Sequence, residues 1–260
     1  MDPIVSPDWL RGHLDDVTVI DCQYVLGDPD EGHRRYLTGH VPGATFLSVE
    51  RDLSGSAGGG RNPLPTDDEV VAVARRAGVR DDTPVVAYDQ AMVGGAARLW
   101  WLLRHLGKED VAVLDDGLDA WDGPLVTGEE TAAPGDLTPR PRRGDAIDAE
   151  DVAERLHDPG RILVDTRAPA RYRGEEEPVD PVAGHIPGAR NLPNSQAVPA
   201  ALVDADEEVV AYCGSGVSAC VLLLRLADAG RDDAKLYAGS WSEWSSLGLP
   251  VATGEDDADV

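Results

Sequence analysis

The residue with the clearest chemical potential in this chain is Cys213, which directly follows the segment Glu208–Tyr212. This segment is rich enough in β-branched and aromatic residues to predict a short buried strand, and residues 219–229 carry apolar side chains at helical spacing. Cys213 is therefore expected at a strand-to-helix junction. Junctions of this kind are where parallel sheets bind anions.

The loop after this cysteine, Gly214-Ser215-Gly216-Val217-Ser218, favours a negative charge. Its glycines allow backbone amides to turn inward, and the first turn of the next helix adds unpaired N–H donors and the positive end of the helix dipole. These groups stabilise a thiolate, so we expect Cys213 to act as a nucleophile. The alternative is that Cys213 is a small core residue at a strand end, as free cysteines often are.

Length and cysteine content indicate the broad class of protein. The 260 residues suffice for two domains, each with its own core, and the three cysteines at 22, 213 and 220 do not form a disulfide framework. Their spacing matches neither a redox pair nor a zinc site, so we expect no metal and no cofactor. The first residues show no basic region followed by an apolar stretch, and no apolar run is as long as a membrane span, so we expect no signal peptide and a cytoplasmic protein.

The charge of the chain excludes some partners. It has 48 acidic and 23 basic residues, a formal net charge of -25, and its only lysines are Lys108 and Lys235. Such a surface repels nucleic acids and acidic membranes, and we expect a monomer. An acidic, lysine-poor composition is typical of proteins from salt-accumulating halophilic archaea, so we interpret the charge as an adaptation of solvation.

An internal repeat indicates the fold. Predicted strands at 17–21 and 161–165 each end in an aspartate, and each is followed by an Arg-Tyr pair and a Gly-His-x-Pro-Gly-Ala turn. Segment 84–89 then matches segment 208–213, which aligns Asp89 with Cys213. Strands that alternate with helical patterns predict an α/β fold of two tandem domains, each a parallel sheet flanked by helices. We predict domains at 1–130 and 146–260, joined by a linker at 131–145 that is rich in proline and glycine.

Four motifs together resemble the tandem-domain rhodanese sulfurtransferases over nearly the whole chain: RYRG at 171–174, GHIPGA at 184–189, YCGSGVSA at 212–219 and GSWSEW at 239–244. In that family the second domain carries the catalytic cysteine and the first is a silent copy, which implies these roles for Cys213 and Asp89. The resemblance implies that a sulfane sulfur passes from 3-mercaptopyruvate or thiosulfate, through a Cys213 persulfide, to cyanide, a thiol or a protein acceptor.

The resemblance also implies roles for the neighbours of the cysteine. Ser215 would assist proton transfer, and Arg171 would bind the carboxylate or sulfonate of the donor. The alternative for Arg171 is an ordinary surface arginine. Backbone amides of the loop would receive the charge of the persulfide; they belong to Gly214, Ser215, Gly216, Val217 and Ser218.

Two positions depart from the family pattern. Asn62 stands where some relatives have a histidine proposed to complete a proton relay, and Asp180 stands near the place of a second substrate arginine. Other candidates recur in both halves or lie inside a helix, and we interpret them as structural: His40, His185, Asp21, Asp165 and Cys220.

A nucleophilic cysteine also serves other classes of protein. A cysteine phosphatase needs Cys-x5-Arg, but the sixth residue after Cys213 is Ala219, so this activity is not expected. A sulfur carrier or regulatory module with negligible turnover of small donors is an open alternative. Gly214 and Ser215 offer no cation to dianionic thiosulfate, so we expect 3-mercaptopyruvate to be preferred. The alternative is a thiosulfate-preferring enzyme that takes its positive charge from Arg61 or Arg190.

Overall fold

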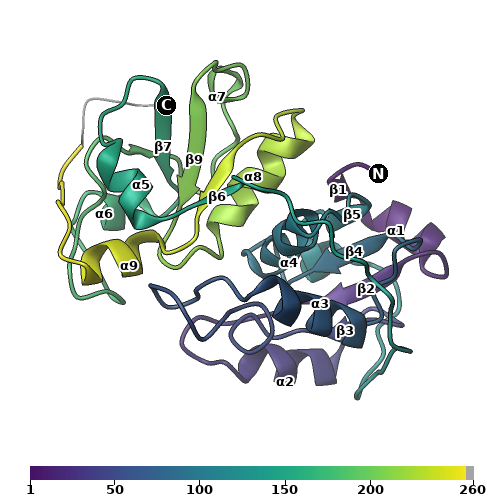
Figure 1. The fold of residues 1–260 in the computed structure, drawn as a ribbon. Helices are drawn as coiled ribbons and strands as arrows, with labels where there is room; N and C mark the ends of the chain where they lie inside the picture. Colours follow the sequence, from purple (N-terminus) through teal and green to yellow (C-terminus); the bar gives the residue numbers. More distant parts are fainter. Residues whose placement is uncertain (256–260) are drawn as a thin grey trace. The chain divides into compact units, whose positions relative to one another are not determined.

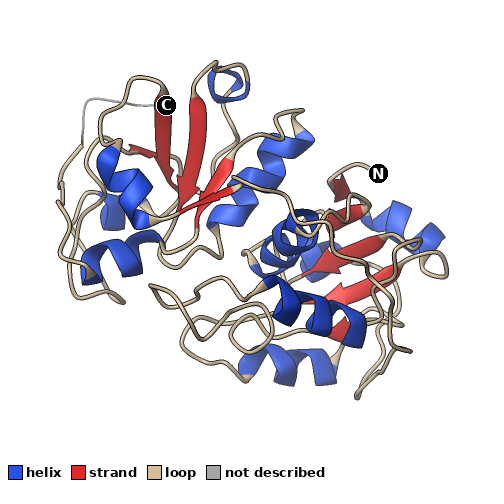
Figure 2. Cartoon of the chain, in the orientation of Figure 1, coloured by secondary structure: helices blue, strands red, loops and turns tan. Residues whose placement is uncertain are grey.

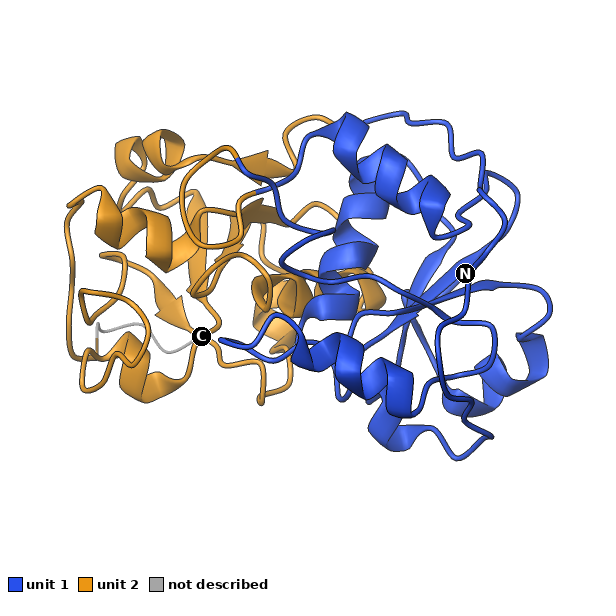
Figure 3. Cartoon of the chain, turned by 90° about the horizontal axis from the view of Figure 1, so that it is seen from below, with its two compact units in different colours: residues 1–56, 64–142 blue, residues 57–63, 143–260 orange. Residues whose placement is uncertain are grey.

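The computed structural model describes residues 1–255, and its internal contacts divide the chain into two units. Unit 1 comprises residues 1–56 and 64–142, and unit 2 comprises residues 57–63 and 143–260 (Figure 3). Each unit is built on a parallel five-stranded sheet flanked by helices (Figures 1 and 2). The predicted fold class is therefore confirmed. Within residues 1–255, none of the helices is long and apolar enough to cross a membrane.

In unit 1 the strand order is β1-β5-β4-β2-β3. The elements in chain order are β1 (Ile4–Val5), α1 (Pro7–His13), β2 (Thr18–Asp21), α2 (Glu31–Thr38), β3 (Thr45–Phe46), α3 (Asp67–Arg76), β4 (Val85–Tyr88), α4 (Gly95–His105), β5 (Val111–Leu114) and the 3-10 turn η1 (Gly117–Ala120). Unit 2 repeats this arrangement with the order β6-β10-β9-β7-β8. Its elements are β6 (Ala146–Ile147), α5 (Ala149–Glu154), β7 (Arg161–Asp165), α6 (Pro169–Tyr172), β8 (Arg190–Asn191), α7 (Ala200–Val203), β9 (Glu208–Tyr212), α8 (Ala219–Asp228), β10 (Lys235–Tyr237) and α9 (Ser240–Ser246).

The central strands β4 and β9 explain the pattern seen in the sequence. Each is hydrogen-bonded to a parallel neighbour on both sides and has helices near it, so its side chains are buried in a continuous run. Helix α4 packs on β4 and β5, and α8 packs on β9 and β10. Both helices are apolar around most of their circumference because they are buried in this way.

Aromatic side chains complete the core of unit 2 beneath its last helix. Trp241 and Trp244 of α9 are fully buried and share a cluster with Tyr212 and Tyr237. The indole of Trp241 donates to the carbonyl of Val182, and that of Trp244 donates to Pro250. Helix α9 is therefore anchored against β9 and β10, and its first turn reaches the loop that follows β9.

Candidate functional site

Cys213 is the first residue after β9, the middle strand of its sheet. Because the sheet is parallel, the residue lies at the carboxyl edge, and the loop 213–218 leads directly into α8 at Ala219. The predicted strand-to-helix junction is thus confirmed. Cys213 is only 2% exposed, so the surrounding loop controls which groups can reach its sulfur.

Gly216 brings a backbone amide to the cysteine. Its N–H lies 3.1 Å from Sγ of Cys213, within reach of a hydrogen bond to sulfur. The residue has φ +76°, and a Cβ there would collide with the carbonyl of Ala238. Only glycine combines this left-handed backbone with so close an approach. Cys220 is fully buried in α8, where its Sγ lies 3.4 Å from the carbonyl of Gly216, as expected of a core residue.

The start of α9 holds the other side of the loop, a contact that the sequence did not reveal. The N–H of Cys213 donates to Oγ of Ser240 over 3.1 Å. The amides of Trp241 and Ser242 donate to the carbonyls of Cys213 and Gly214, each over 3.0 Å. Ser240 has φ +54°, a strained value for a residue with a side chain. The internal repeat contains a signal for this backbone conformation. Unit 1 has a glycine after β5, the strand that corresponds to β10, and this residue, Gly117, has φ +59°.

Unit 1 shows what the equivalent loop does with a negative charge. The carboxylate of Asp89, which follows β4, is buried and accepts four backbone hydrogen bonds over 3.0–3.2 Å. The donors are the amides of Ala91, Val93, Gly94 and Ala96. Burial nonetheless outweighs these bonds and raises the pKa of Asp89. The loop of unit 1 is an anion-binding nest filled by its own side chain.

Two guanidinium groups lie beside Gly214. A Cβ at this glycine would lie 2.9 Å from Nη2 of Arg61 and 3.5 Å from Nη1 of Arg171. Arg171 comes from α6 and Arg61 from the segment 57–63, which packs with unit 2. The backbone N–H of Arg61 donates to Oγ of Ser242 over 3.1 Å, which fixes the segment against α9. Arg171 is the ligand for the donor that the sequence predicts, and Arg61 is only an alternative source of positive charge.

Each of these arginines is paired with a buried carboxylate. Nη2 of Arg171 lies 2.7 Å from Oε1 of Glu177 and 3.2 Å from Oδ2 of Asp180. Nη1 of Arg61 donates to Oδ1 of Asp180. The side chains of Glu177 and Asp180 are 3% and 4% exposed. The sequence motifs do not indicate a role for Glu177 in the site, because this residue lies in a run of acidic residues that is typical of a solvated surface.

The remaining candidates near the cysteine occupy the positions expected of loop residues. Ser215 and Val217 are buried, and Ser218 is the residue before α8, where its carbonyl accepts a hydrogen bond from Asn194 over 2.7 Å. Asn62 is buried in the segment that carries Arg61. The roles of Ser215, Val217 and Ser218 in binding and proton transfer stay predictions.

The two repeated histidines have matching local partners. Nδ1 of His40 lies 2.8 Å from the carbonyl of Tyr36, and Nδ1 of His185 lies 2.7 Å from that of Tyr172. Each ring also stacks on the same tyrosine. Both histidines are fully buried, so these contacts support the structural interpretation. The strand-end aspartates are also locally bonded, Asp21 to Gln23 and Asp165 to Arg167.

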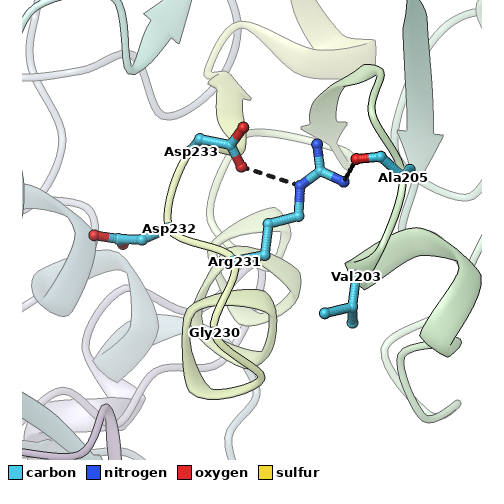
Figure 4. A pocket seen from close by; sticks show the side chains of 6 residues that line it. All are labelled: Val203, Ala205, Gly230, Arg231, Asp232 and Asp233. Carbon is cyan, nitrogen blue, oxygen red and sulfur yellow. Dashed lines mark hydrogen bonds and ion pairs between the residues drawn. The ribbon is translucent and has the colours of Figure 1, made fainter.

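A surface pocket elsewhere in unit 2 has a structural explanation. It is lined by Val203, Ala205, Gly230, Arg231, Asp232 and Asp233 (Figure 4). The guanidinium of Arg231 donates to the carbonyls of Leu202, Ala205 and Glu207 and to Asp233. Its donors tie together the turns around α7 and β10. Because Arg231 donates to several groups of the fold, we interpret it as a residue that stabilises the fold rather than as one that binds a ligand.

Comparisons with known proteins find matches to both units of the chain. The model of the Rhodanese-like domain matches residues 6–123 and 148–247. A probable 3-mercaptopyruvate sulfurtransferase of Pseudomonas aeruginosa is 45% identical over 92% of this chain and 93% of its own length. A putative thiosulfate sulfurtransferase, SseB of Mycobacterium tuberculosis, is 43% identical over 89% of both chains. The names of these two relatives indicate different sulfur donors, 3-mercaptopyruvate and thiosulfate.

A solved structure gives the same match in three dimensions. The structure of SseA from Escherichia coli, described with the 3-mercaptopyruvate sulfotransferases, superposes with a TM-score of 0.80 at 31% identity. The match covers 94% of this chain and 100% of that one.

Proposed function

The chain belongs to the rhodanese-like family and is a sulfurtransferase, and we propose that a persulfide on Cys213 carries its sulfur, with 3-mercaptopyruvate as the preferred donor. The supporting observation is the placement of Cys213 at the edge of a parallel sheet, with a loop amide 3.1 Å from Sγ and Arg171 beside the next residue. A thiolate, a set of amide donors and a guanidinium are what sulfur transfer from an anionic donor requires.

In the first half-reaction the Cys213 thiolate attacks the sulfur of 3-mercaptopyruvate. The new S–S bond forms as the C–S bond breaks, and the electron pair of that bond passes to the carbon as the enolate of pyruvate. The thiol proton of the donor moves to this carbon, so the products are pyruvate and a persulfide anion. Ser215 relays this proton in our proposal, and the amides after Cys213 receive the charge of the persulfide. Arg171 holds the donor carboxylate.

In the second half-reaction the acceptor attacks the outer sulfur of the persulfide. With cyanide, the S–S bond breaks, thiocyanate leaves, and the electron pair returns to Cys213 as a thiolate. A thiol acceptor takes the same sulfur as its own persulfide. No electron carrier is needed because the donor, the enzyme and the acceptor exchange one neutral sulfur atom in turn.

The preference for 3-mercaptopyruvate follows from charge. Thiosulfate is a dianion and leaves as sulfite, which is also a dianion, whereas 3-mercaptopyruvate carries one carboxylate. The guanidiniums of Arg61 and Arg171 are countered by Glu177 and Asp180, so the site offers little net positive charge. One uncompensated charge at a partly exposed site costs on the order of 1 to 2 kcal/mol, or about tenfold in rate.

Intact mass spectrometry tests the persulfide directly. Purified protein incubated with each donor should gain one sulfur atom, and cyanide should remove it. Cys213→Ala should abolish this gain, whereas Cys22→Ala, a change in the core of unit 1, should keep it. Sulfur found on Cys22 or Cys220 contradicts the proposed role of Cys213. A kcat/KM that favours thiosulfate by about tenfold contradicts the proposed donor.

The protein is further proposed to act as a monomer in the cytoplasm. A net charge of -25 opposes self-association at low salt. The three cysteines are free and buried, which fits a reducing compartment. The salt-adapted source suggested by the composition stays a prediction.

A further inference from the structure

The position between Arg61 and Arg171 is filled by a carboxylate of the chain itself. Asp180 accepts from Nη1 of Arg61 through Oδ1 and lies 3.2 Å from Nη2 of Arg171 through Oδ2. A carboxylate that bridges two guanidiniums in this way occupies the place that two arginines would offer to an anionic ligand. The Nε of Arg61 is also buried without a partner in the described part of the chain, so Asp180 does not satisfy this arginine fully.

Glu177 and Asp180 are held in different ways. Glu177 is shared by Arg171 and Arg167, and its Oε1 also accepts the amides of Val179 and Asp180, each over 3.0 Å. These bonds outweigh its burial and keep the pKa of Glu177 below its usual range. Glu177 is thus a fixed support that orients Arg171.

In the described part of the chain, the carboxylate of Asp180 is hydrogen-bonded to the guanidiniums of Arg61 and Arg171. Burial, reinforced by the nearby charge of Glu177, outweighs the attraction of Arg61 and Arg171 and raises the pKa of Asp180. The ionised carboxylate of Asp180 is therefore held less firmly than that of Glu177.

The charges in this cluster cancel. It contains three arginines and three carboxylates, joined in a chain of ion pairs: Arg61, Asp180, Arg171, Glu177, Arg167 and Asp165. A monoanionic donor placed beside Gly214 gives the cluster one excess negative charge, and a dianionic donor gives it two. The repulsion from Asp180 therefore acts once on the first donor and twice on the second.

We propose that Asp180 is a specificity-determining residue, whose carboxylate occupies the anion position between Arg61 and Arg171 and disfavours dianionic sulfur donors relative to monoanionic ones. The inference rests on the proposed function, because it assumes that donors bind beside Gly214. Asp180 acts here by its charge, and it needs no contact with the reacting sulfur.

The test compares wild type with Asp180→Asn, which keeps the size and one acceptor oxygen but removes the charge. We expect kcat/KM to rise for thiosulfate by about tenfold more than for 3-mercaptopyruvate. Asp233→Asn is the matched control, since it removes the same formal charge from an exposed side chain beside Arg231 (Figure 4). It should change the ratio of the two donors by less than about twofold.

A binding measurement separates this inference from the proposed function. The Cys213→Ala variant cannot form the persulfide, so neither donor reacts. Titration calorimetry can then follow the binding of two probes, the dianion thiosulfate and the monoanionic product pyruvate. Asp180→Asn should tighten thiosulfate more than pyruvate, again by about tenfold. If persulfide forms on Cys213 but the ratios stay unchanged in both assays, the inference on Asp180 is wrong and the proposed function stands. If Asp180→Asn weakens the binding of both probes equally, Asp180 only positions Arg61 and the inference is wrong. If binding shifts as expected but no sulfur is loaded, the inference on Asp180 holds and the proposed function fails.

Discussion

Asp89 and Cys213 occupy the same place in two copies of one sheet, each as the first residue after the central strand. Around Asp89 the loop amides close on a carboxylate, and around Cys213 an amide closes on a sulfur. Backbone amides of the loop thus converge on the same position in both units, and the residue type at that position decides whether they meet a carboxyl group or a sulfur. A sulfane sulfur cannot be held by the carboxylate.

The first prediction concerns Asp89 in unit 1. Asp89→Ala leaves four buried amides without their acceptor and should lower the free energy of unfolding by roughly 2 to 4 kcal/mol. The kcat/KM of the folded protein should stay within about twofold of wild type, because Asp89 takes no part in the transfer. Chemical denaturation and steady-state kinetics below the melting range measure the two effects separately. Loss of turnover in a fully folded variant would show that the first unit contributes to the chemistry.

The second prediction uses the strained residue at the start of α9. Ser240→Gly and Ser240→Ala both lose the hydroxyl that accepts the N–H of Cys213, so both should lower kcat/KM, by about tenfold. Only the alanine variant keeps a side chain at φ +54°. At the corresponding position of unit 1, with φ +59°, the chain has a glycine, Gly117. The glycine variant should therefore be more stable than the alanine variant by about 1 kcal/mol. Equal stabilities would mean that Ser240 is not strained, and an active glycine variant would mean that the hydroxyl is not needed.

Much of this architecture could be predicted because its signals are local. The run Glu208–Tyr212 and the helical spacing after it place Cys213 without any knowledge of distant contacts. The repeat then transfers the same interpretation to Asp89. Periodicity within a few residues is preserved in the sequence, and it determines which segments become buried strands and helices.

The charge of the site could not be predicted in the same way. Arg61 and Asp180 are 119 residues apart, and no local pattern pairs them. The two residues after Cys213 carry no positive charge, and the motifs indicate only Arg171 as a contact for the donor. The structure adds Arg61, and it also adds the carboxylates that neutralise both arginines. The balance of charge depends on chain topology, so the sequence motif alone does not determine it.

The third prediction concerns pH and stability in unit 1. Burial raises the pKa of Asp21 to about 6 from the ordinary 3.8, despite hydrogen bonds from Gln23. Since the folded state binds the proton more tightly, the stabilisation is present below the unfolded pKa and is lost as the pH rises through 6. Lowering the pH from about 7.5 to about 5 should therefore favour wild type over Asp21→Asn by about 1 to 2 kcal/mol. Urea unfolding at both pH values measures this change, and a constant difference would contradict it.

The last prediction compares two glycines of the cysteine loop. Gly216 has φ +76°, and a Cβ there meets the backbone of Ala238, which cannot move without shifting the end of β10. Gly216→Ala should therefore lower the free energy of unfolding by roughly 2 to 4 kcal/mol and remove most sulfur loading, because the amide moves away from Sγ of Cys213. At Gly214 the backbone is not left-handed, and the nearest atom to a Cβ is Nη2 of Arg61, at 2.9 Å.

The end of an arginine side chain can shift where a backbone carbonyl cannot. Gly214→Ala should therefore cost less than about 1 kcal/mol in stability. Its effect should appear in the donor KM, which should rise as the guanidinium of Arg61 is displaced, while kcat changes little. Thermal unfolding with kinetics on both donors makes the comparison. If Gly214→Ala proves as damaging to folding as Gly216→Ala, then Arg61 is held as rigidly as the sheet, and the segment 57–63 is part of the fixed framework of the site.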